Sequence, residues 1–162
     1  MDARTRLFCI ETGLPGRFAI AARPRPGEWM DDDVHGWRAS GLDWVVSLLE
    51  DAEVAELSLH AEGDSLRAAG LEFARFPIAD RGVPSSRADF DVLLSRIESA
   101  LRSGRNVAVH CRMGLGRSAL LAAGLLVRLG HQPRAAWVIV AKARGQSVPD
   151  TDAQRAWVVG SG

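Results

Sequence analysis

The sequence predicts an α/β fold in which a central, mostly parallel (mixed) sheet of about five strands is flanked by helices. Two observations support this class. The chain contains short apolar runs typical of buried strands, and amphipathic segments typical of helices alternate with them. A length of 162 residues fits one domain, because domains commonly hold ~100–200 residues. We therefore expect residues 1–162 to form a single domain.

Five short segments are expected to be strands. Residues 44–49 form the clearest one, because a run of β-branched and other apolar residues is typical of a strand buried on both faces. Residues 71–76 alternate between polar and apolar side chains and end before Pro77, which cannot donate to a sheet. The other three segments are residues 7–10, 18–22 and 106–110.

Helices are expected between these strands. The clearest begins at a cap formed by Ser86 or Asp89 and ends at Gly104, with apolar residues recurring on one face. Residues 52–69 show a weaker helical pattern, which Gly63 is expected to divide. The remaining helices are expected from about 31–33 to 41, over 117–129, from 133 to about 144, and from about 150 or 151 onward.

Neither charge nor hydropathy indicates a nucleic-acid-binding or membrane protein. Lys and Arg total 20 and Asp and Glu total 20, so the formal net charge at pH 7 is +0 and nucleic acid is not expected as the main partner. The longest apolar stretch, residues 119–127, is far shorter than the ~20 residues of a membrane span. We therefore expect no membrane span, and the sequence makes no prediction about the oligomeric state.

The two cysteines, Cys9 and Cys111, are too few for a disulfide framework and fit a reducing compartment, so a cytoplasmic location is expected. Cys9 lies in the apolar run 7–10 and is expected in the core, with a regulatory disulfide to Cys111 as the alternative. The five tryptophans are expected mostly in the core. Trp29 lies outside the periodic segments and could rim a pocket.

The residues most informative about function run from His110 to Ser118, with the sequence His-Cys-Arg-Met-Gly-Leu-Gly-Arg-Ser. They lie between an expected strand and an expected helix, where backbone N–H groups and the helix dipole favour an anion. Gly114 and Gly116 would let the loop curl so that its amides face a phosphate. Arg117 adds a planar fork able to hold two phosphate oxygens.

Cys111 opens this loop and faces the same positive potential, which favours the thiolate, the nucleophilic form of the side chain. Ser118 is placed to donate a hydroxyl hydrogen bond to that sulfur. Gly114-x-Gly116-x-x-Ala119 also matches a dinucleotide fingerprint, but the acidic residue needed ~20 positions further on is absent. A tight turn with a buried cysteine would explain the glycines, but not the spacing of Cys, Arg and Ser.

The segment resembles the signature loop of the cysteine-dependent protein phosphatases, His-Cys-x5-Arg-[Ser/Thr]. Its Gly-Leu-Gly-Arg-Ser ending is most similar to small dual-specificity phosphatases of the cyclin-dependent-kinase-associated type. The resemblance covers about residue 31 to the C-terminus, which implies a phosphatase-type fold with a catalytic core at about 31–160. It also implies that phosphate is bound by the Arg117 side chain and by loop amides, those of Arg112, Met113, Gly114, Leu115, Gly116 and Arg117.

The family needs a general acid on a separate loop to protonate the leaving oxygen. Residues 76–84 resemble that loop, which puts Asp80 in the position of the acid. Asp80 could also be an ordinary turn residue in Asp-x-Gly. Asp89 and Asp91 are the fallback candidates for the acid, although carboxylates in the first turn of a helix are also favoured by its dipole.

Two further residues have supporting roles in the family. Residues 148–154 resemble the region whose glutamine places the hydrolytic water, which makes Gln154 the candidate; Thr151-x-x-Gln154 is equally a capping box. His110 is expected to hydrogen-bond around the loop and tune the thiolate. The remaining histidines have no companion at metal-ligand spacing, so neither a metal nor another cofactor is expected.

The resemblance implies a metal-free phosphomonoester hydrolase with Cys111, Arg117, Asp80 and Ser118 as catalytic residues and a phosphocysteine intermediate. The expected partner is a phosphoprotein carrying phosphotyrosine and also phosphoserine or phosphothreonine, and phosphate, vanadate or sulfate is expected to occupy the site. The chain has no tyrosine, so it lacks the tyrosine-bearing recognition loop of larger tyrosine-specific relatives. The alternatives are a phosphatase of a non-protein phosphate (a phosphoinositide or an RNA end), a phosphate-binding module without turnover, and a sulfur transferase.

Overall fold

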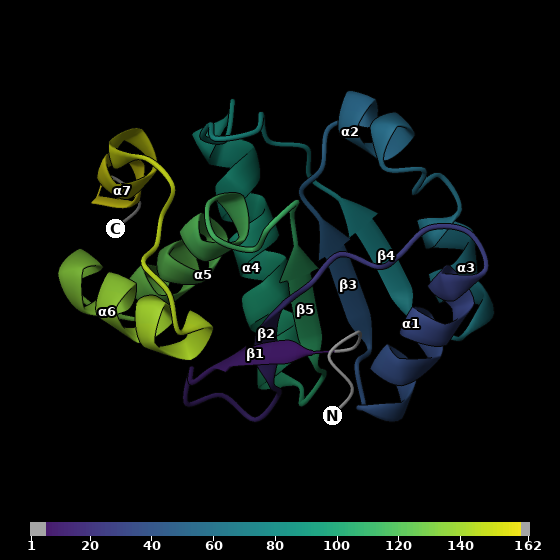
Figure 1. Ribbon diagram of the computed structural model, residues 1–162. Helices are drawn as coiled ribbons and strands as arrows, with labels where there is room; N and C mark the ends of the chain where they lie inside the picture. Colours follow the sequence, from purple (N-terminus) through teal and green to yellow (C-terminus); the bar gives the residue numbers. More distant parts are fainter. Residues whose placement is uncertain (1–5, 160–162) are drawn as a thin grey trace.

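The computed structural model describes residues 6–159 and contains one five-stranded mixed sheet with helices on both faces (Figure 1). The strand order is β1-β2-β5-β3-β4, in which only β1 and β2 pair antiparallel. The strands are β1 (Leu7–Ile10), β2 (Phe18–Ala21), β3 (Trp44–Ser47), β4 (Glu72–Arg75) and β5 (Val107–His110). The predicted α/β class and the mixed sheet of five strands are confirmed.

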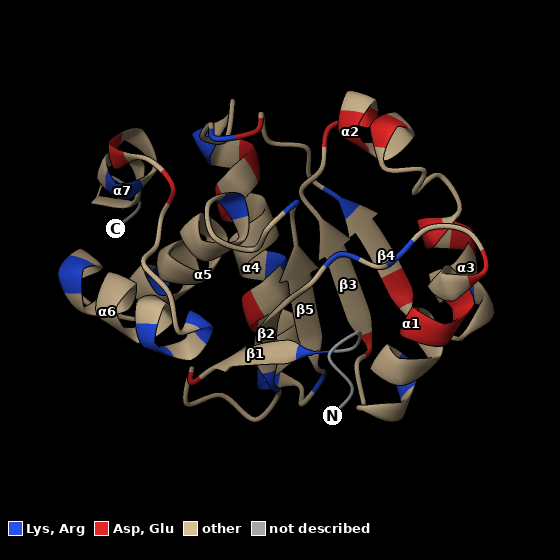
Figure 2. Cartoon of the chain, in the orientation of Figure 1, with Lys and Arg blue, Asp and Glu red and all other residues tan. Residues whose placement is uncertain are grey.

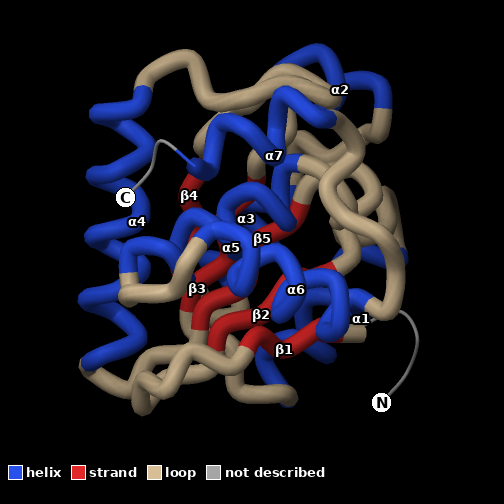
Figure 3. The backbone as a smooth tube through the Cα atoms, turned by 90° about the vertical axis from the view of Figure 1, so that its left-hand side faces the viewer, coloured by secondary structure: helices blue, strands red, loops and turns tan. Residues whose placement is uncertain are grey.

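Seven helices are described, and they divide between the two faces of the sheet. α1 and α3 pack on one face, α4, α5 and α6 pack on the other, and α7 contacts α5 (Figures 1 and 3). Their bounds are α1 (Trp29–Ala39), α2 (Asp51–Glu56), α3 (Glu62–Ala68), α4 (Arg87–Arg102), α5 (Arg117–Arg128), α6 (Pro133–Arg144) and α7 (Asp152–Val159).

The core lies on both sides of the sheet because neighbouring strand residues point to opposite faces. On β3, Trp44 and Val46 belong to the cluster beneath α4 and α5, whereas Val45 belongs to the cluster beneath α1 and α3. All four β3 residues are buried, as the run of apolar residues predicts for a strand covered on both faces. The central strands are therefore held rigidly, and so are the segments that leave their ends.

Most expected elements are present within two or three residues of their predicted bounds. The clear difference concerns residues 52–69, where α2 ends at Glu56 and α3 begins at Glu62, so the break precedes Gly63. Within the break Ser58 adopts a φ of +56°, which stops a right-handed helix. Gly63 lies inside α3, where a Cβ atom would be 2.9 Å from the ring of Phe73. The glycine permits helix–sheet packing rather than dividing the helix.

The prediction that Cys9 is in the core is wrong. Cys9 is exposed, and Cys9 and Cys111 are both free, so the alternative of a disulfide is not seen either. β1 is an edge strand, and of its residues only Ile10 is buried. An apolar run of four residues does not reveal which side of an edge strand faces solvent. Within residues 6–159, no helix has the length and apolar character to cross a membrane.

Candidate active site

The cysteine loop, residues 111–116, joins β5 to α5 at the carboxyl ends of the parallel strands. This edge of a parallel sheet is where α/β proteins commonly bind ligands. α5 begins after Gly116, so no side chain caps its first-turn N–H groups. Gly114 has a φ of +73°, a left-handed conformation that suits glycine and lets the chain curl. The predicted strand–loop–helix arrangement is confirmed.

Cys111 lies at the base of this loop, with an exposed fraction of 3 %. The backbone N–H of Gly114 donates to its Sγ over 3.2 Å, so at least one loop amide points at the sulfur. A hydrogen bond from an amide is stronger to a thiolate than to a neutral thiol. This hydrogen bond therefore holds the sulfur at the base of the loop.

The guanidinium of Arg117 is buried and joins three segments of the chain. Its Nη1 donates to Glu53 Oε1 over 2.6 Å and to the carbonyl of Ile78 over 2.9 Å. Its Nη2 donates to Glu53 Oε2 over 2.9 Å and to Asp80 Oδ1 over 3.2 Å. Burial works against the charge, but the hydrogen bonds with Glu53 and the negative charge of Cys111 outweigh burial, so the pKa of Arg117 is raised. The guanidinium is therefore cationic and fixed in position.

Glu53 is the carboxylate that holds this arginine, and sequence reasoning missed it. It lies in α2, where its side chain also accepts a hydrogen bond from the Glu50 N–H over 3.1 Å as part of a capping box. Burial alone would raise the pKa of Glu53, but hydrogen bonds with Arg117 and with the Glu50 backbone lower it to about 2. The sequence around Glu53 indicates only a glutamate that caps a helix, and this pattern does not predict that Glu53 binds Arg117.

Asp80 lies after β4 on the loop that approaches the cysteine loop, where its carboxylate contacts Arg117. Its side chain is 53 % exposed, so solvent and a substrate can reach it. The turn that the sequence also suggested is present, because the Gly82 N–H donates to the carbonyl of Ala79 over 2.7 Å. The structure thus brings Asp80 to Arg117 and leaves it on a turn, so the two interpretations of this residue are compatible.

The fallback acids are placed differently. Asp89 is in the first turn of α4, and its backbone N–H donates to Ser86 Oγ over 3.1 Å, as expected for a helix start. Within the described structure, neither Asp89 nor Asp91 has a hydrogen bond or ion pair with Arg117. Of the three candidate aspartates, Asp80 is the one in contact with the motif.

Ser118 is the second residue of α5 and is fully buried. Its hydroxyl has no hydrogen-bond partner among residues 6–159. The hydrogen bond expected from Ser118 to the sulfur of Cys111 is therefore not present in this structure, and the catalytic role expected for Ser118 stays a prediction. The sulfur accepts the Gly114 N–H instead, because the curled loop brings that amide within reach.

His110 is the last residue of β5 and is completely buried. Its Nε2 lies 2.6 Å from Glu62 Oε2, and its Nδ1 lies 3.4 Å from the carbonyl oxygen of Cys111. The Trp37 ring stacks on it with centroids 6.2 Å apart. His110 therefore reaches the first carbonyl of the cysteine loop, as expected. Sequence reasoning missed Glu62, which comes from α3 and has no signal of its own.

Gln154 is buried in α7 and forms the predicted capping box. Its N–H donates to Thr151 Oγ1 over 3.1 Å, and its Oε1 accepts from the Thr151 N–H over 3.2 Å. Its Nε2 donates to the carbonyl of Gly82 over 3.0 Å, which links α7 to the loop that carries Asp80. A Cβ atom at Gly116 would lie 3.1 Å from that Nε2, so the amide is also beside the cysteine loop.

Arg144 is a second buried arginine at the cysteine loop, and the sequence analysis did not single it out. Its Nε donates to the carbonyl of Gly114 over 2.9 Å and its Nη2 to the carbonyl of Met113 over 3.4 Å. Burial and the nearby charge of Arg6 lower the pKa of Arg144 below its ordinary value. By binding loop carbonyls from outside, the guanidinium favours a loop whose N–H groups face inward. A basic residue in the last turn of a helix is common, which is why it carries no signal.

Of the other loop side chains, Arg112 is ion-paired and Met113 and Leu115 are apolar. The Arg112 guanidinium donates to Glu56 over 2.8 Å and to Glu53 over 3.4 Å, and so faces α2. Met113 is 65 % exposed, and Leu115 is half-buried. Within the described residues, no group of three or more His, Cys, Asp or Glu could hold a metal ion. The arrangement offers a sulfur with one loop amide pointing at it, a fixed cation, and an exposed carboxylate in contact with that cation.

Comparison with known proteins decides the family. A family model described as "Polymorphic toxin system, DSP-PTPase phosphatase" matches residues 20–131, which is well over half of the chain. The chain belongs to this family of dual-specificity-type phosphatases. The family match begins within β2 and spans both the Asp80 loop and the cysteine loop of this chain.

Among curated proteins, the chain is similar to cyclin-dependent kinase inhibitor 3 of Rattus norvegicus. The identity is 28 % over 97 residues, which are 60 % of this chain and 45 % of that protein. The chain spans about half the length of the curated relatives it matches. Among solved structures, it is similar to kinase associated phosphatase with its catalytic-site cysteine changed to serine (TM-score 0.90, 20 % identity, 98 % and 94 % of the two chains). It is also similar to PTPMT1 in complex with PI(5)P (TM-score 0.74, 21 % identity, 89 % and 88 %).

Proposed function

We propose that this chain hydrolyses phosphomonoesters on proteins, at phosphotyrosine and also at phosphoserine or phosphothreonine, through a phosphocysteine intermediate at Cys111. One observation carries the proposal. The buried Arg117 guanidinium, fixed by Glu53, lies at the start of α5 beside a curled loop that begins with Cys111, and it contacts an exposed carboxylate, Asp80. Nucleophile, cation and acid are the three groups that phosphoryl transfer to a thiolate needs.

In the first step the Cys111 Sγ attacks phosphorus, so that an S–P bond forms while the P–O bond to the substrate breaks. Asp80 gives its proton to the leaving oxygen. Arg117 and the amides from Arg112 to Arg117 stabilise the charge on the three equatorial oxygens. No metal is required in this scheme, because the fixed cation and the amide dipoles supply the positive potential.

In the second step a water attacks phosphorus and the P–S bond breaks, which releases phosphate and returns the thiolate. The ionised Asp80 takes the proton of that water. Gln154 is close to both loops and is proposed to orient the water with its remaining amide N–H. Ser118 is proposed to donate to the departing sulfur after a rotation of its hydroxyl, which has no competing partner among the described residues. His110, held by Glu62, supports the first carbonyl of the loop.

The proposed nucleophile is tested by vanadate-sensitive release of p-nitrophenol from its phosphate ester in the presence of a chelator. Cys111→Ser should abolish turnover and leave phosphate-ester binding intact, because a serine hydroxyl is not ionised near neutral pH while the amides remain in place. Cys9→Ser is the matched control and should keep full activity, since Cys9 is exposed on an edge strand. Turnover by Cys111→Ser close to the wild-type rate would exclude the covalent mechanism.

A reactive thiolate also favours a reducing compartment, so we infer a cytoplasmic location.

A second candidate substrate class is a non-protein phosphate. Arg112 directly follows the nucleophile, and the structural neighbour PTPMT1 is described in complex with PI(5)P. The Arg112 side chain is paired with Glu56 and Glu53, however, and the loop positions Met113 and Leu115 are apolar. Parallel assays on a phosphotyrosine peptide and a soluble phosphoinositide separate the two classes, and we expect the higher kcat/KM on the peptide.

A further inference from the structure

A basic pocket of about 350 Å³ lies beside the cysteine loop. It is lined by three arginines, Arg23, Arg25 and Arg112, together with Met113 and two prolines of the segment that joins β2 to α1. Its described lining contains no Asp or Glu. In Figure 2 this segment carries blue stretches as it passes in front of the sheet. A half-enclosed volume that is rich in guanidinium groups is suited to an anion.

Of the three arginines that line this pocket, Arg23 is the one whose charge is not paired with a described carboxylate. Arg25 is engaged by Asp33, with contacts of 2.8 to 3.1 Å, and Arg112 is engaged by Glu53 and Glu56. Arg23 makes no ion pair with any described residue; its Nη1 donates to a neutral acceptor, a backbone carbonyl, over 2.6 Å. Its other N–H donors and its full charge are therefore free to bind a ligand.

The pocket is held in shape before any ligand arrives. Pro24 and Pro26 fix their φ angles, which restricts the backbone on both sides of Arg25. Asp33, whose side chain is 1 % exposed, anchors the Arg25 guanidinium with both carboxylate oxygens. The exposed ring of Trp29 lies 4.7 Å from the same guanidinium. A preorganised pocket loses less conformational entropy when it binds an anion.

The pocket is joined to the cysteine loop by shared residues. The carbonyl that Arg23 binds is that of Arg112, the residue directly after Cys111. Arg112 and Met113 line the pocket and belong to the cysteine loop, so the pocket directly adjoins that loop. The exposed Met113 side chain forms an apolar element of this wall. One extended substrate can therefore reach both volumes.

We propose that this pocket binds a second phosphate of a doubly phosphorylated protein segment while the first phosphate is hydrolysed at Cys111. The inference rests on the proposed function and names its substrate class. Arginine forks match phosphate geometry, and a dianion gains more than a carboxylate from an unpaired guanidinium. The apolar Met113 suits the carbon chain between two phosphorylated side chains. An inositol ring, which bears hydroxyl groups between its phosphates, would leave them against an apolar side chain.

The experiment compares synthetic phosphotyrosine peptides that differ only in one serine, phosphorylated or not, placed at successive positions on either side of the target. At the best position the second phosphate should raise kcat/KM about 5- to 10-fold, mainly through KM, as expected for charge-assisted hydrogen bonds at a half-exposed site. In Arg23→Gln the ratio of the two kcat/KM values should fall close to one. The ratio is the readout because Arg23 also supports the Arg112 carbonyl, so the absolute rate can change for a structural reason.

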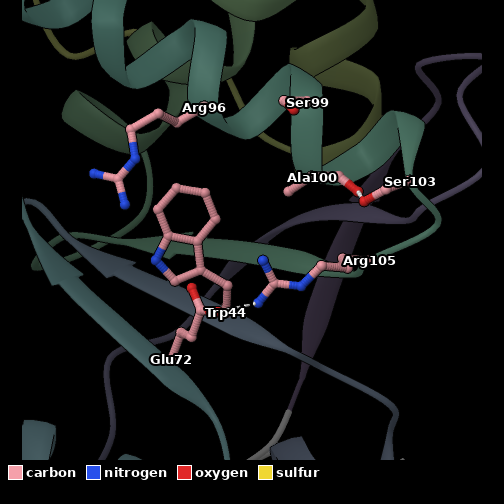
Figure 4. Close-up of a pocket in the computed structure, with 7 residues that line it drawn as sticks. All are labelled: Trp44, Glu72, Arg96, Ser99, Ala100, Ser103 and Arg105. Carbon is pink, nitrogen blue, oxygen red and sulfur yellow. Dashed lines mark hydrogen bonds and ion pairs between the residues drawn. The ribbon is translucent and has the colours of Figure 1, made fainter.

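Arg96→Gln is the matched control. Arg96 projects beside Trp44 at a different hollow of about 280 Å³, which lies where β3 and β4 begin and so at the opposite edge of the sheet (Figure 4). This variant should keep the wild-type ratio. A loss of the ratio in Arg96→Gln as large as in Arg23→Gln would show a general charge effect and overturn the subsite.

Binding to Cys111→Ser separates failure of the subsite from failure of the proposed function. Fluorescence anisotropy should show tighter binding of the doubly phosphorylated peptide, and this preference should be lost when Arg23→Gln is added. If that pattern holds but the wild-type protein hydrolyses neither peptide, the subsite stands and the proposed function fails. If both peptides are hydrolysed equally at every position, or if the ratio survives Arg23→Gln, the subsite is wrong and the proposed function stands. The assignment to a protein segment would be overturned if the protein preferred soluble inositol bisphosphates to monophosphates but showed no preference between the two peptides.

Discussion

Arg117 binds two carboxylates at once. Because one is buried and the other is exposed, substitutions at the two residues should have different effects. Glu53 is buried and holds the guanidinium with both oxygens, whereas Asp80 is half exposed and touches one nitrogen at 3.2 Å. An incoming phosphate competes with the weaker and more accessible contact. We therefore expect Glu53 to act on the arginine alone and Asp80 to act on the substrate.

Asp80→Asn tests the acid by varying the leaving group. A phenyl oxygen needs a proton in order to depart, so hydrolysis of phenyl phosphate should slow by ~10²–10⁴-fold. An aryl ester with several electron-withdrawing groups departs almost unaided and should slow much less in the same step. Asp80 is proposed to act in both steps. Single-turnover measurements must therefore give the rate of attack by Cys111 separately from the rate of phosphocysteine hydrolysis. Asp89→Asn is the control, since Asp89 makes no hydrogen bond or ion pair with Arg117 in the part of the chain that the structure describes. Equal slowing of all esters by Asp80→Asn, or no slowing, would reduce Asp80 to a turn residue.

Glu53→Gln keeps the shape of the side chain and removes its charge. The pKa of Glu53 in the folded protein is about 2, below the ordinary 4.5, so its carboxylate stabilises the fold fully above pH 4.5 and loses this effect as the pH falls toward 2. The stability difference between wild type and Glu53→Gln should therefore shrink over that window, as measured by urea unfolding at successive pH values. Glu56→Gln removes an exposed carboxylate from the same helix and should show little change. A difference that stays constant down to pH 2 would contradict the assigned pair.

At the scale of secondary-structure elements, the cysteine loop depends on helices that contribute none of its residues. α3 holds the end of β5 through Glu62 and His110, α2 holds Arg117 through Glu53, and α6 holds the loop carbonyls through Arg144. Each contact is made by a side chain that is nine-tenths or more buried. The loop is therefore shaped by its surroundings as much as by its own glycines.

Glu62→Gln probes the contact between α3 and β5. An amide in place of the carboxylate weakens the 2.6 Å contact with His110 in a site closed to water. The free energy of unfolding should therefore fall by about 1–3 kcal/mol. Urea denaturation measures this loss, and Asp64→Asn, on the exposed side of α3, is expected to stay within ~0.5 kcal/mol of wild type. If Glu62→Gln is as stable as Asp64→Asn, the pair does not hold the strand.

The arrangement of these helices and strands explains which residues of the candidate site could be predicted from the sequence and which could not. The cysteine loop could be predicted because its residues are consecutive and sit between a clear strand and a clear helix. Asp80 was predicted because residues 76–84 resemble the acid loop of the family. Glu53, Glu62 and Arg144 are each tens of residues from the loop in sequence, and only the packing of their helices brings them near it. Cys9 was misplaced for a related reason, since an apolar run does not tell an edge strand from a central one.

For the whole molecule, an anion that binds the folded protein alone must stabilise it. Inorganic phosphate at ~10 times its dissociation constant should raise Tm by about 3–6 °C in a chain of this size. Cys111→Ser should respond in the same way, because the amides and the arginine are unchanged. Sodium chloride at equal ionic strength is the control in differential scanning calorimetry. An equal rise with chloride would show general screening rather than a phosphate site.

The strand order also determines when the cysteine loop can take its position. β5 is the last strand in sequence, yet it lies between β2 and β3, and Cys111, the proposed nucleophile, directly follows it. Without β5, the antiparallel pair β1–β2 and the parallel pair β3–β4 have no hydrogen-bonded strand to join them. Closing that gap requires contacts across most of the chain, which are slow to form and cooperative. Cys111, the proposed nucleophile, is therefore expected to take its position only when the sheet is completed.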